Sequence, residues 1–332
     1  MDARRAARLV FSFAPVAGLV ARPEPRPEGI SAIVRVRGEE EWLEPAVLSI
    51  RDFADEIVIL DNGASPTARA AIERVQSKLG ERLVRVDCPL LDIFEVSNLG
   101  LARARYRFTV RWDADFVGHT DGPGNLGELR HHLLGLDRRR YFAVRLPAAE
   151  VAGDLRHQFP DCRIRHDGLA HTASTRTRFV RVRRETPTAS LAIAERVLRD
   201  RPRLAFALES LALPRYYAVL NWPRIAYFHV HVKPAAHLLL RHFWLEWLAE
   251  PDTGRYPSLE SYALHQARVR WGIDDPEAAA AHLMRQLWAG LVPFDESLCG
   301  PYPELLRGHV EEGRYAVEYA GGRIVGRREA RP

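Results

Sequence analysis

From residue 29 onward, short apolar stretches alternate with longer ones in which apolar positions recur every three or four residues. The short stretches predict strands and cover residues 30–36, 56–60, 83–86, 107–112 and 141–146. The longer stretches predict helices, as at Ile72, Val75 and Leu79, after which Gly80 supplies a helix end. Strands and helices that alternate at this spacing are typical of an α/β fold with a mostly parallel central sheet flanked by helices.

The pattern changes in the C-terminal third of the chain. Residues 227–233 predict one more strand, residues from 235 to about 291 have a helical pattern, and residues 315–327 predict a terminal hairpin. Together with the N-terminal segment, this divides the chain into an extension and linker (1–28), an α/β domain (29–234) and a helical C-terminal region (235–332).

The N-terminal segment has an apolar run over residues 9–21 that follows several arginines. Ser12 and Pro15 interrupt the run, which is shorter than the roughly 18 residues that a membrane span needs. Because Asp2 lies in the basic part, a secretory signal is the less favoured interpretation. We expect a tail that docks on the core or covers a sheet edge, followed by an extended proline-rich linker.

The cysteines are three in number, Cys88, Cys162 and Cys299, and they are widely spaced with no CxxC pair. This pattern predicts neither a disulfide framework nor a zinc cluster, and it favours a cytoplasmic location.

The formal net charge of +5 comes almost wholly from arginine, since Lys78 and Lys233 are the only lysines. A modest positive excess suits anionic small molecules. The basic residues form no run interleaved with aromatic ones, so nucleic acid is not an expected partner.

Carboxylates follow two of the predicted strands. Asp61 begins an Asp-Asn-Gly turn after one strand, and Asp113 and Asp115 form a DxD motif after another. Side chains at positions i and i+2 of an extended backbone point the same way, so both acids of the DxD can face one divalent cation. Such a cation neutralises a departing diphosphate, which indicates group transfer from an activated donor. Plain turn chemistry is the alternative for Asp61.

Three segments in this order resemble the family 2 glycosyltransferases of the GT-A fold: residues 35–40 (RVRGEE), 55–65 (DEIVILDNGAS) and 112–115 (WDAD). The resemblance covers residues 29–120 and is specific as a set. Two departures bear on the donor base: Gly38 stands where Asn is usual, and Ala64 is inserted before Ser65.

The resemblance implies roles in donor binding. The backbone near Arg35 and Arg37, with the side chains of Glu40 and Asp61, would hold the nucleotide base and ribose. Residues 29–234 would then be the nucleotide-sugar-binding and catalytic domain, and residues 235–332 would shape the acceptor site.

The resemblance also implies a metal-diphosphate site. Asp115 would bind Mg²⁺ or Mn²⁺ directly, with Asp113 nearer the ribose, and a late histidine and lysine would face the diphosphate. His229, His231 and Lys233 alternate along one strand and therefore share a face, which fits that element. The two histidines are also compatible with an edge-strand pair that holds no metal.

The expected activity is transfer of a sugar from a nucleoside diphosphate sugar, UDP-linked, to a hydroxyl of a diffusible acceptor. An inverting transfer needs a base after the DxD, and Asp167 is chosen over Asp161 and His171 because Asp167-Gly168 suits a loop. Trp244 and Trp247 are assigned to the helical core. A nucleotidyltransferase is the alternative enzyme, but residues 37–40 lack its glycine-rich phosphate loop; a catalytically silent nucleotide- or sugar-binding module is the other alternative.

Overall fold

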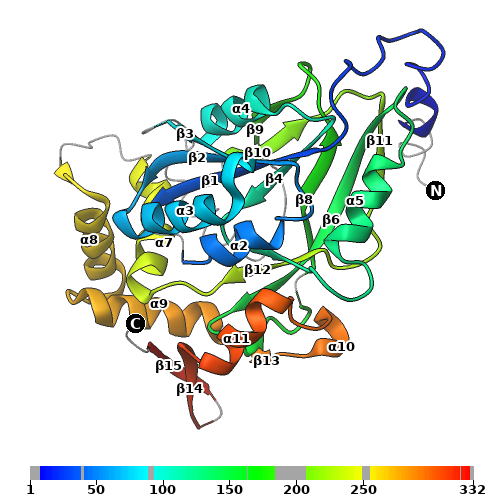
Figure 1. Ribbon diagram of the computed structural model, residues 1–332. Coiled ribbons are helices and arrows are strands. Elements are labelled where there is room, and N and C mark those ends of the chain that lie inside the picture. Colours follow the sequence, from blue (N-terminus) through cyan, green and yellow to red (C-terminus); the bar gives the residue numbers. More distant parts are fainter. Residues whose placement is uncertain are drawn as a thin grey trace.

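The computed structural model describes residues 8–38, 41–88, 93–162, 164–183, 207–248, 255–321 and 323–329. Glu40 lies outside these residues. Figure 1 shows a layered α/β molecule in which helices cover a large, curled sheet. The sequence prediction of an α/β fold with a flanked central sheet is therefore confirmed.

The sheet carries a parallel block at one side. Its strands are β1 (Ile30–Gly38), β2 (Glu56–Ala64), β3 (Leu83–Asp87) and β4 (Phe108–Asp113), all parallel. Next to β4 lies β8 (Arg165–Thr172), antiparallel both to β4 and to the long strand β6 (Tyr141–Ala152). Strand β12 (Tyr227–His231) runs parallel to β6 and antiparallel to the short strand β5 (Phe116–Gly118). Strand β11 (Tyr217–Asn221) also pairs with β6.

Helices bury both faces of the parallel block. Val34 and Val36 of β1 pack in the same cluster as α2 (Leu43–Ser49), α3 (Pro66–Leu79) and α5 (Leu126–Leu134). Ile33, which points to the opposite face, packs with Val96 of α4 (Ile93–Arg103). Alternation along one strand thus places its residues in two cores, as expected for a sheet covered on both sides.

The C-terminal region adds helices α7 (Ala235–Leu248), α8 (Leu259–Trp271) and α9 (Pro276–Trp288), which share a core. Beyond them, β13 (Val292–Pro293) pairs with β7 (His157–Gln158) and so joins the main sheet. The short helix α10 (Glu296–Cys299) and helix α11 (Glu304–Glu312) follow, and β14 (Tyr315–Ala320) with β15 (Arg323–Glu329) form the predicted terminal hairpin. A separate pair, β9 (Arg178–Arg183) and β10 (Ala207–Ala212), lies beside α4 in Figure 1.

Strand β2 does not end at Asp61, as its turn signal predicts. The strand continues to Ala64, with a register shift between Val36 and Gly38 of β1. Oδ1 of Asp61 accepts the backbone N–H groups of Gly63 and Ala64, at 3.2 and 2.8 Å. The turn chemistry therefore produces an irregularity within the strand instead of a strand end.

The described part of the N-terminal segment docks on the core. Nη2 of Arg140 donates to Oγ of Ser12 at 2.6 Å, and the Arg140 guanidinium lies 3.9 Å from the centre of the Phe13 ring. The Tyr141 hydroxyl donates to the backbone oxygen of Arg22 at 3.0 Å. Within the described residues, the helices are all too short or too polar to cross a membrane.

The cysteine prediction is wrong for one pair. Cys162 and Cys299 form a disulfide between residues 137 positions apart, which joins the loop after β7 to α10. Their wide spacing hid the pairing, because β13 brings the C-terminal region back to the sheet edge where Cys162 lies. Cys88 is buried and free.

Candidate active site

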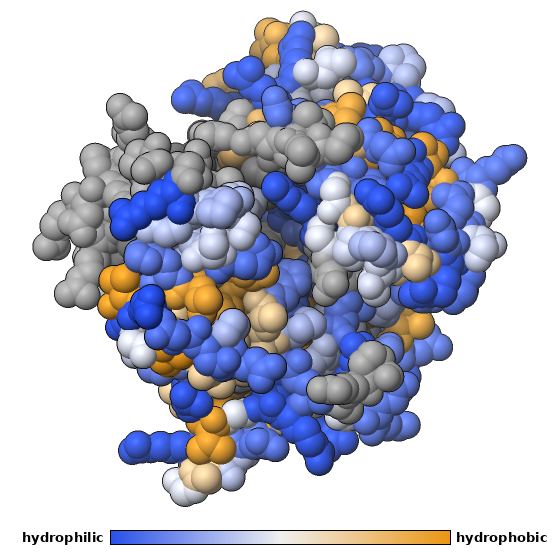
Figure 2. Space-filling model, turned by 90° about the vertical axis from the view of Figure 1, so that its left-hand side faces the viewer, coloured by the Kyte–Doolittle hydropathy of each residue, from blue (hydrophilic) through white to orange (hydrophobic). Residues whose placement is uncertain are grey.

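A cavity of about 680 Å³ opens at the carboxyl ends of β1 and β4. Figure 2 looks onto this side of the molecule, where hydrophilic residues predominate around a hollow. Helices α7 and α8 form its other wall. The strand edge contributes Arg35, Arg37, Asn62, Asp113 and Asp115, and the C-terminal region contributes Lys233, His237, Arg241, Trp244 and Glu260. In α/β sheets this edge is where ligands bind, and the cavity has the size of a typical small-molecule site.

Asp113, the first acid of the DxD, pairs with two arginines. Its Oδ1 lies 2.9 Å from Nη2 of Arg35, and its Oδ2 lies 3.4 Å from Nη2 of Arg111. Strand register explains the first contact, because Arg35 and Asp113 are direct partners across β1 and β4. Burial would raise the pKa of Asp113, but Arg111 and Arg35 lower it, so the carboxylate is charged at neutral pH.

Asp115, the second acid, is buried and has a different set of partners. Its Oδ2 lies 2.9 Å from Nζ of Lys233, and its Oδ1 lies 3.5 Å from Nε2 of His229. Arg241 of α7 approaches to 4.0 Å. Burial opposes ionisation of Asp115, yet Lys233 and then His229 hold its pKa well below the usual value. The DxD therefore places its two carboxylates in two neighbouring groups of cationic side chains.

His229 and His231 lie on β12 with their rings 3.7 Å apart. A third residue joins them: Oε1 of Glu150 on β6 lies 3.8 Å from Nδ1 of His229 and 3.5 Å from Nε2 of His231. Parallel pairing of β12 with β6 sets His229 directly opposite Glu150. Burial, and next the neighbouring His229, lower the pKa of His231 to about 4, so its imidazole is neutral at pH 7.

Asp61 lies behind the cavity, whose wall is formed instead by its neighbour Asn62. Oδ2 of Asp61 lies 2.7 Å from Nη2 of Arg85 and 3.6 Å from Nε of Arg69. Although burial would raise the pKa of Asp61, its bond from the Ala64 N–H and the charge of Arg85 lower it. A role for Asp61 in donor binding stays a prediction.

Among the residues of α7 that line the cavity, three have polar or aromatic side chains that the sequence pattern did not assign to a site: His237, Arg241 and Trp244. The Arg37 guanidinium lies 5.4 Å from the centre of the Trp244 ring. The prediction that Trp244 belongs to the helical core is therefore wrong, because this side of α7 faces the cavity. Burial, followed by Lys233 and Arg241, lowers the pKa of His237 to about 4.

Two of the candidate bases, Asp167 and His171, lie near opposite ends of β8. His171 pairs with Thr109 at the start of β4, the end of the strand away from Asp113, so the structure does not bring it to the cavity. Asp167 lies near the other end of β8, where the register shifts opposite Leu146 and Ala148 of β6. Its side chain is outside the described part of the chain, and its role as base stays a prediction.

Sequence reasoning missed Glu150, which is 1% exposed. The signal was present: Glu150 is the one acid in a strand from Tyr141 to Ala152 whose only other charged residue is Arg145. Acids are rarely buried without a partner, so an acid in such a strand indicates a site or a buried ion pair.

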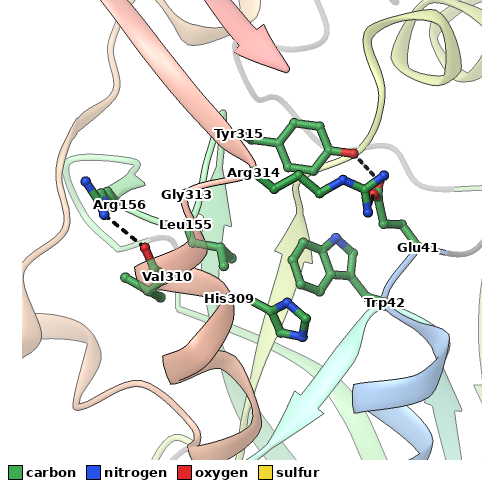
Figure 3. A pocket seen from close by; sticks show the side chains of 9 residues that line it. All are labelled: Glu41, Trp42, Leu155, Arg156, His309, Val310, Gly313, Arg314 and Tyr315. Atoms are coloured by element: carbon green, nitrogen blue, oxygen red, sulfur yellow. Dashed lines mark hydrogen bonds and ion pairs between the residues drawn. The ribbon is translucent and has the colours of Figure 1, made fainter. Parts of the chain in front are cut away.

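A smaller cavity of about 40 Å³ lies near the start of α2. Figure 3 shows Arg314 and Tyr315 both pointing to Glu41, and Trp42 facing His309 of α11. Nη1 of Arg314 lies 2.6 Å from Oε1 of Glu41, and the Tyr315 hydroxyl donates to Oε2. These contacts tie the chain before α2 to the C-terminal hairpin.

Comparison with known proteins gives structural matches only. No protein-family model matches the chain, and no curated protein matches its sequence. The structure is similar to mannosyltransferase PcManGT from Pyrobaculum calidifontis in complex with GDP-Man and Mn²⁺, at 14% identity and a TM-score of 0.37, over 94% of this chain and 89% of that chain. It is also similar to S. aureus TarS 1-349 in complex with UDP, at 11% identity and a TM-score of 0.36, over 88% of this chain and 94% of that chain. TM-scores of this size carry no weight in assigning a reaction.

Proposed function

We propose that the protein is a glycosyltransferase that moves a sugar from a nucleoside diphosphate sugar, UDP-linked, to a hydroxyl of a diffusible acceptor. The observation that carries this proposal is the convergence of Asp113, Asp115 and Lys233 with three arginines in one cavity at the carboxyl edge of the sheet. Acids paired with cations, beside the exposed side chains of Arg37 and Arg241, suit a ligand that brings a diphosphate and a polar sugar together.

The diphosphate would meet Arg37 and Arg241 first. Both side chains are exposed at the cavity, whereas Arg35 is held by Asp113 and Lys233 is held by Asp115. As negative charge grows on the departing diphosphate, guanidinium groups fixed in place stabilise it without reorganisation. The ring of Trp244, already stacked under Arg37, offers a flat apolar surface for the base or the sugar.

The donor atoms beside Asp115 fit a divalent cation. Asp115, Glu150, His229 and His231 supply two carboxylates and two imidazoles within one small region. A cation bound there would add positive charge next to the diphosphate. Asp113 fits less well as a ligand, because both of its oxygens face arginines.

The acceptor would enter along α8, where Leu259 and Glu260 line the cavity. For an inverting reaction, Asp167 is the proposed base, since its backbone lies on β8, the strand next to β4 in the sheet. In this scheme it takes the proton of the acceptor hydroxyl as oxygen attacks the anomeric carbon and the bond to the diphosphate breaks.

The proposal is tested by incubating the protein with UDP-, GDP- and dTDP-sugars and measuring free nucleoside diphosphate, with and without Mn²⁺. A glycosyltransferase is expected to hydrolyse one of these donors slowly and so release its nucleoside diphosphate. Asp115→Asn is expected to abolish this release, with an unchanged circular dichroism spectrum. Binding of a nucleotide with no release under any acceptor supports the silent module instead. Full activity in Asp115→Asn contradicts the role of that residue.

A further inference from the structure

Glu150, His229 and His231 form a cluster with the geometry of a metal site. Their ligand atoms all lie within 4.8 Å of one another. Oε1 of Glu150 lies 3.8 Å from Nδ1 of His229 and 3.5 Å from Nε2 of His231. Ligand atoms around a tetrahedral cation at about 2.0–2.1 Å lie roughly 3.4 Å apart, so the two separations that involve Glu150 are already close to this spacing.

The cluster is built on strands and not on loops. Glu150 sits on β6, and both histidines sit on β12, which is paired with β6 from Tyr227 to His231. The ring of His229 is held from the side by Phe116, with ring centres 4.8 Å apart. When ligands are fixed by backbone pairing and ring packing, their side chains lose little conformational entropy as an ion binds.

Asp115 adds the contact that orients a histidine ligand. It faces Nε2 of His229, while Nδ1 of the same ring faces Glu150. A carboxylate at one ring nitrogen holds the proton there and leaves the lone pair of the other nitrogen for the metal. Asp115 is also occupied by Lys233 at 2.9 Å, which competes with direct ligation of a cation.

We infer that the protein binds a transition-metal cation of the Mn²⁺ or Zn²⁺ type through Glu150, His229 and His231, with Asp115 as a positioning residue. Imidazole nitrogens favour such cations over Mg²⁺, which prefers oxygen ligands. Water or a phosphate oxygen would fill the remaining positions from the cavity side, because His229 lines the cavity. The role of the metal in catalysis depends on the proposed function, but the ability of the site to bind a metal does not.

The test is Mn²⁺ binding to the full chain without nucleotide, followed by electron paramagnetic resonance that detects nitrogen nuclei bound to the ion. The wild type is expected to bind one equivalent with nitrogen coupling. Glu150→Gln and His231→Gln lose this binding, and His231, the more exposed of the two, provides a variant that folds if the first does not. Asp115→Asn keeps the nitrogen coupling but binds about 10- to 100-fold more weakly.

Two matched variants serve as controls. Asp113→Asn removes the other acid of the DxD, and His132→Gln removes an exposed histidine on α5; both are expected to bind Mn²⁺ as the wild type does. Binding without nitrogen coupling, binding lost in Asp113→Asn but kept in Glu150→Gln, or no binding to the folded wild type would each overturn the inference.

These experiments distinguish failure of the inferred metal site from failure of the proposed function. A nitrogen-coupled Mn²⁺ with no response to any nucleoside diphosphate retains the metal site and rejects the proposed function. A nucleotide response with no nitrogen-coupled Mn²⁺ rejects the metal site alone.

Discussion

Lys233 and Asp115 form a buried ion pair in the floor of the cavity, with Nζ 2.9 Å from Oδ2 and only 4% of Lys233 exposed. The pair joins the turn after β4 to the chain between β12 and α7, so it connects the sheet edge to the C-terminal helices. Its position gives the lone lysine of this region both a structural and an electrostatic task.

Removal of the lysine should therefore destabilise the fold as well as the site. Lys233→Met leaves the Asp115 carboxylate buried with only His229 and the more distant Arg241, and we expect a loss of about 3 kcal/mol in the free energy of unfolding. Urea denaturation measures this loss. Lys78→Met, at an exposed ion pair with Glu44, is the matched control and should change stability by less than about 1 kcal/mol. Equal stability of the two variants would contradict the buried pair.

The pair of Arg37 and Trp244 should contribute to nucleotide affinity rather than to stability. Both line the cavity, and Arg37 is exposed. We expect Arg37→Ala to weaken binding of a nucleoside diphosphate about tenfold, equivalent to about 1.4 kcal/mol, with a smaller dependence on salt than the wild type. Isothermal titration at two salt concentrations measures both effects. Unchanged affinity would place the diphosphate elsewhere.

Buried histidines predict the direction of the pH dependence of stability. Burial lowers the pKa of His171 to about 4. Between the usual value of 6.5 and about 4, the unfolded chain binds a proton here that the folded chain does not. Stability therefore falls as the pH drops through this window, by at most about 1.4 kcal/mol per pH unit for this group.

Urea denaturation at pH 7 and pH 5 checks this dependence. His171→Gln should lose part of the difference between the two pH values, whereas His132→Gln, at an exposed position, should not. The same slope in wild type and His171→Gln would show that other groups cause it.

The disulfide between Cys162 and Cys299 predicts sensitivity to reductant. It links two residues that are 137 positions apart, and the backbone oxygen of Cys162 accepts the N–H of Glu150 at 3.3 Å. Cys162→Ser should lower stability by about 2–4 kcal/mol in oxidising buffer and have no further effect in reducing buffer. Cys88→Ser is the control without a disulfide. Mass spectrometry of unreduced peptides that finds Cys162 free would contradict the bond.

The sequence pattern predicted the sheet because periodicity and turn residues are local signals. Strands β1 to β4, the helices between them and the terminal hairpin all follow from such signals. The pattern also placed Asp61, Asp113 and Asp115 at the ends of two strands, and the carboxyl ends of parallel strands meet at one edge.

The contacts that the sequence pattern could not predict depend on pairing between strands that are distant in the sequence. Glu150 meets His229 only because β12 inserts beside β6, and no local signal fixes that pairing. The contacts of Trp244 depend in the same way on how α7 packs against the edge of the sheet. The disulfide was missed for the same reason, because β13 returns to β7 across more than a hundred residues.

The central claim, a nucleoside diphosphate site that depends on Asp115, is tested most directly by thermal denaturation with UDP, GDP, dTDP and CMP, each with Mn²⁺ or EDTA. At a hundredfold excess over the dissociation constant, a ligand of the folded state adds about 2.7 kcal/mol of stability. We predict a shift in melting temperature with UDP that requires Mn²⁺ and is absent in Asp115→Asn. No shift with any of the nucleotides, or an equal shift in Asp115→Asn, would contradict the proposed donor site.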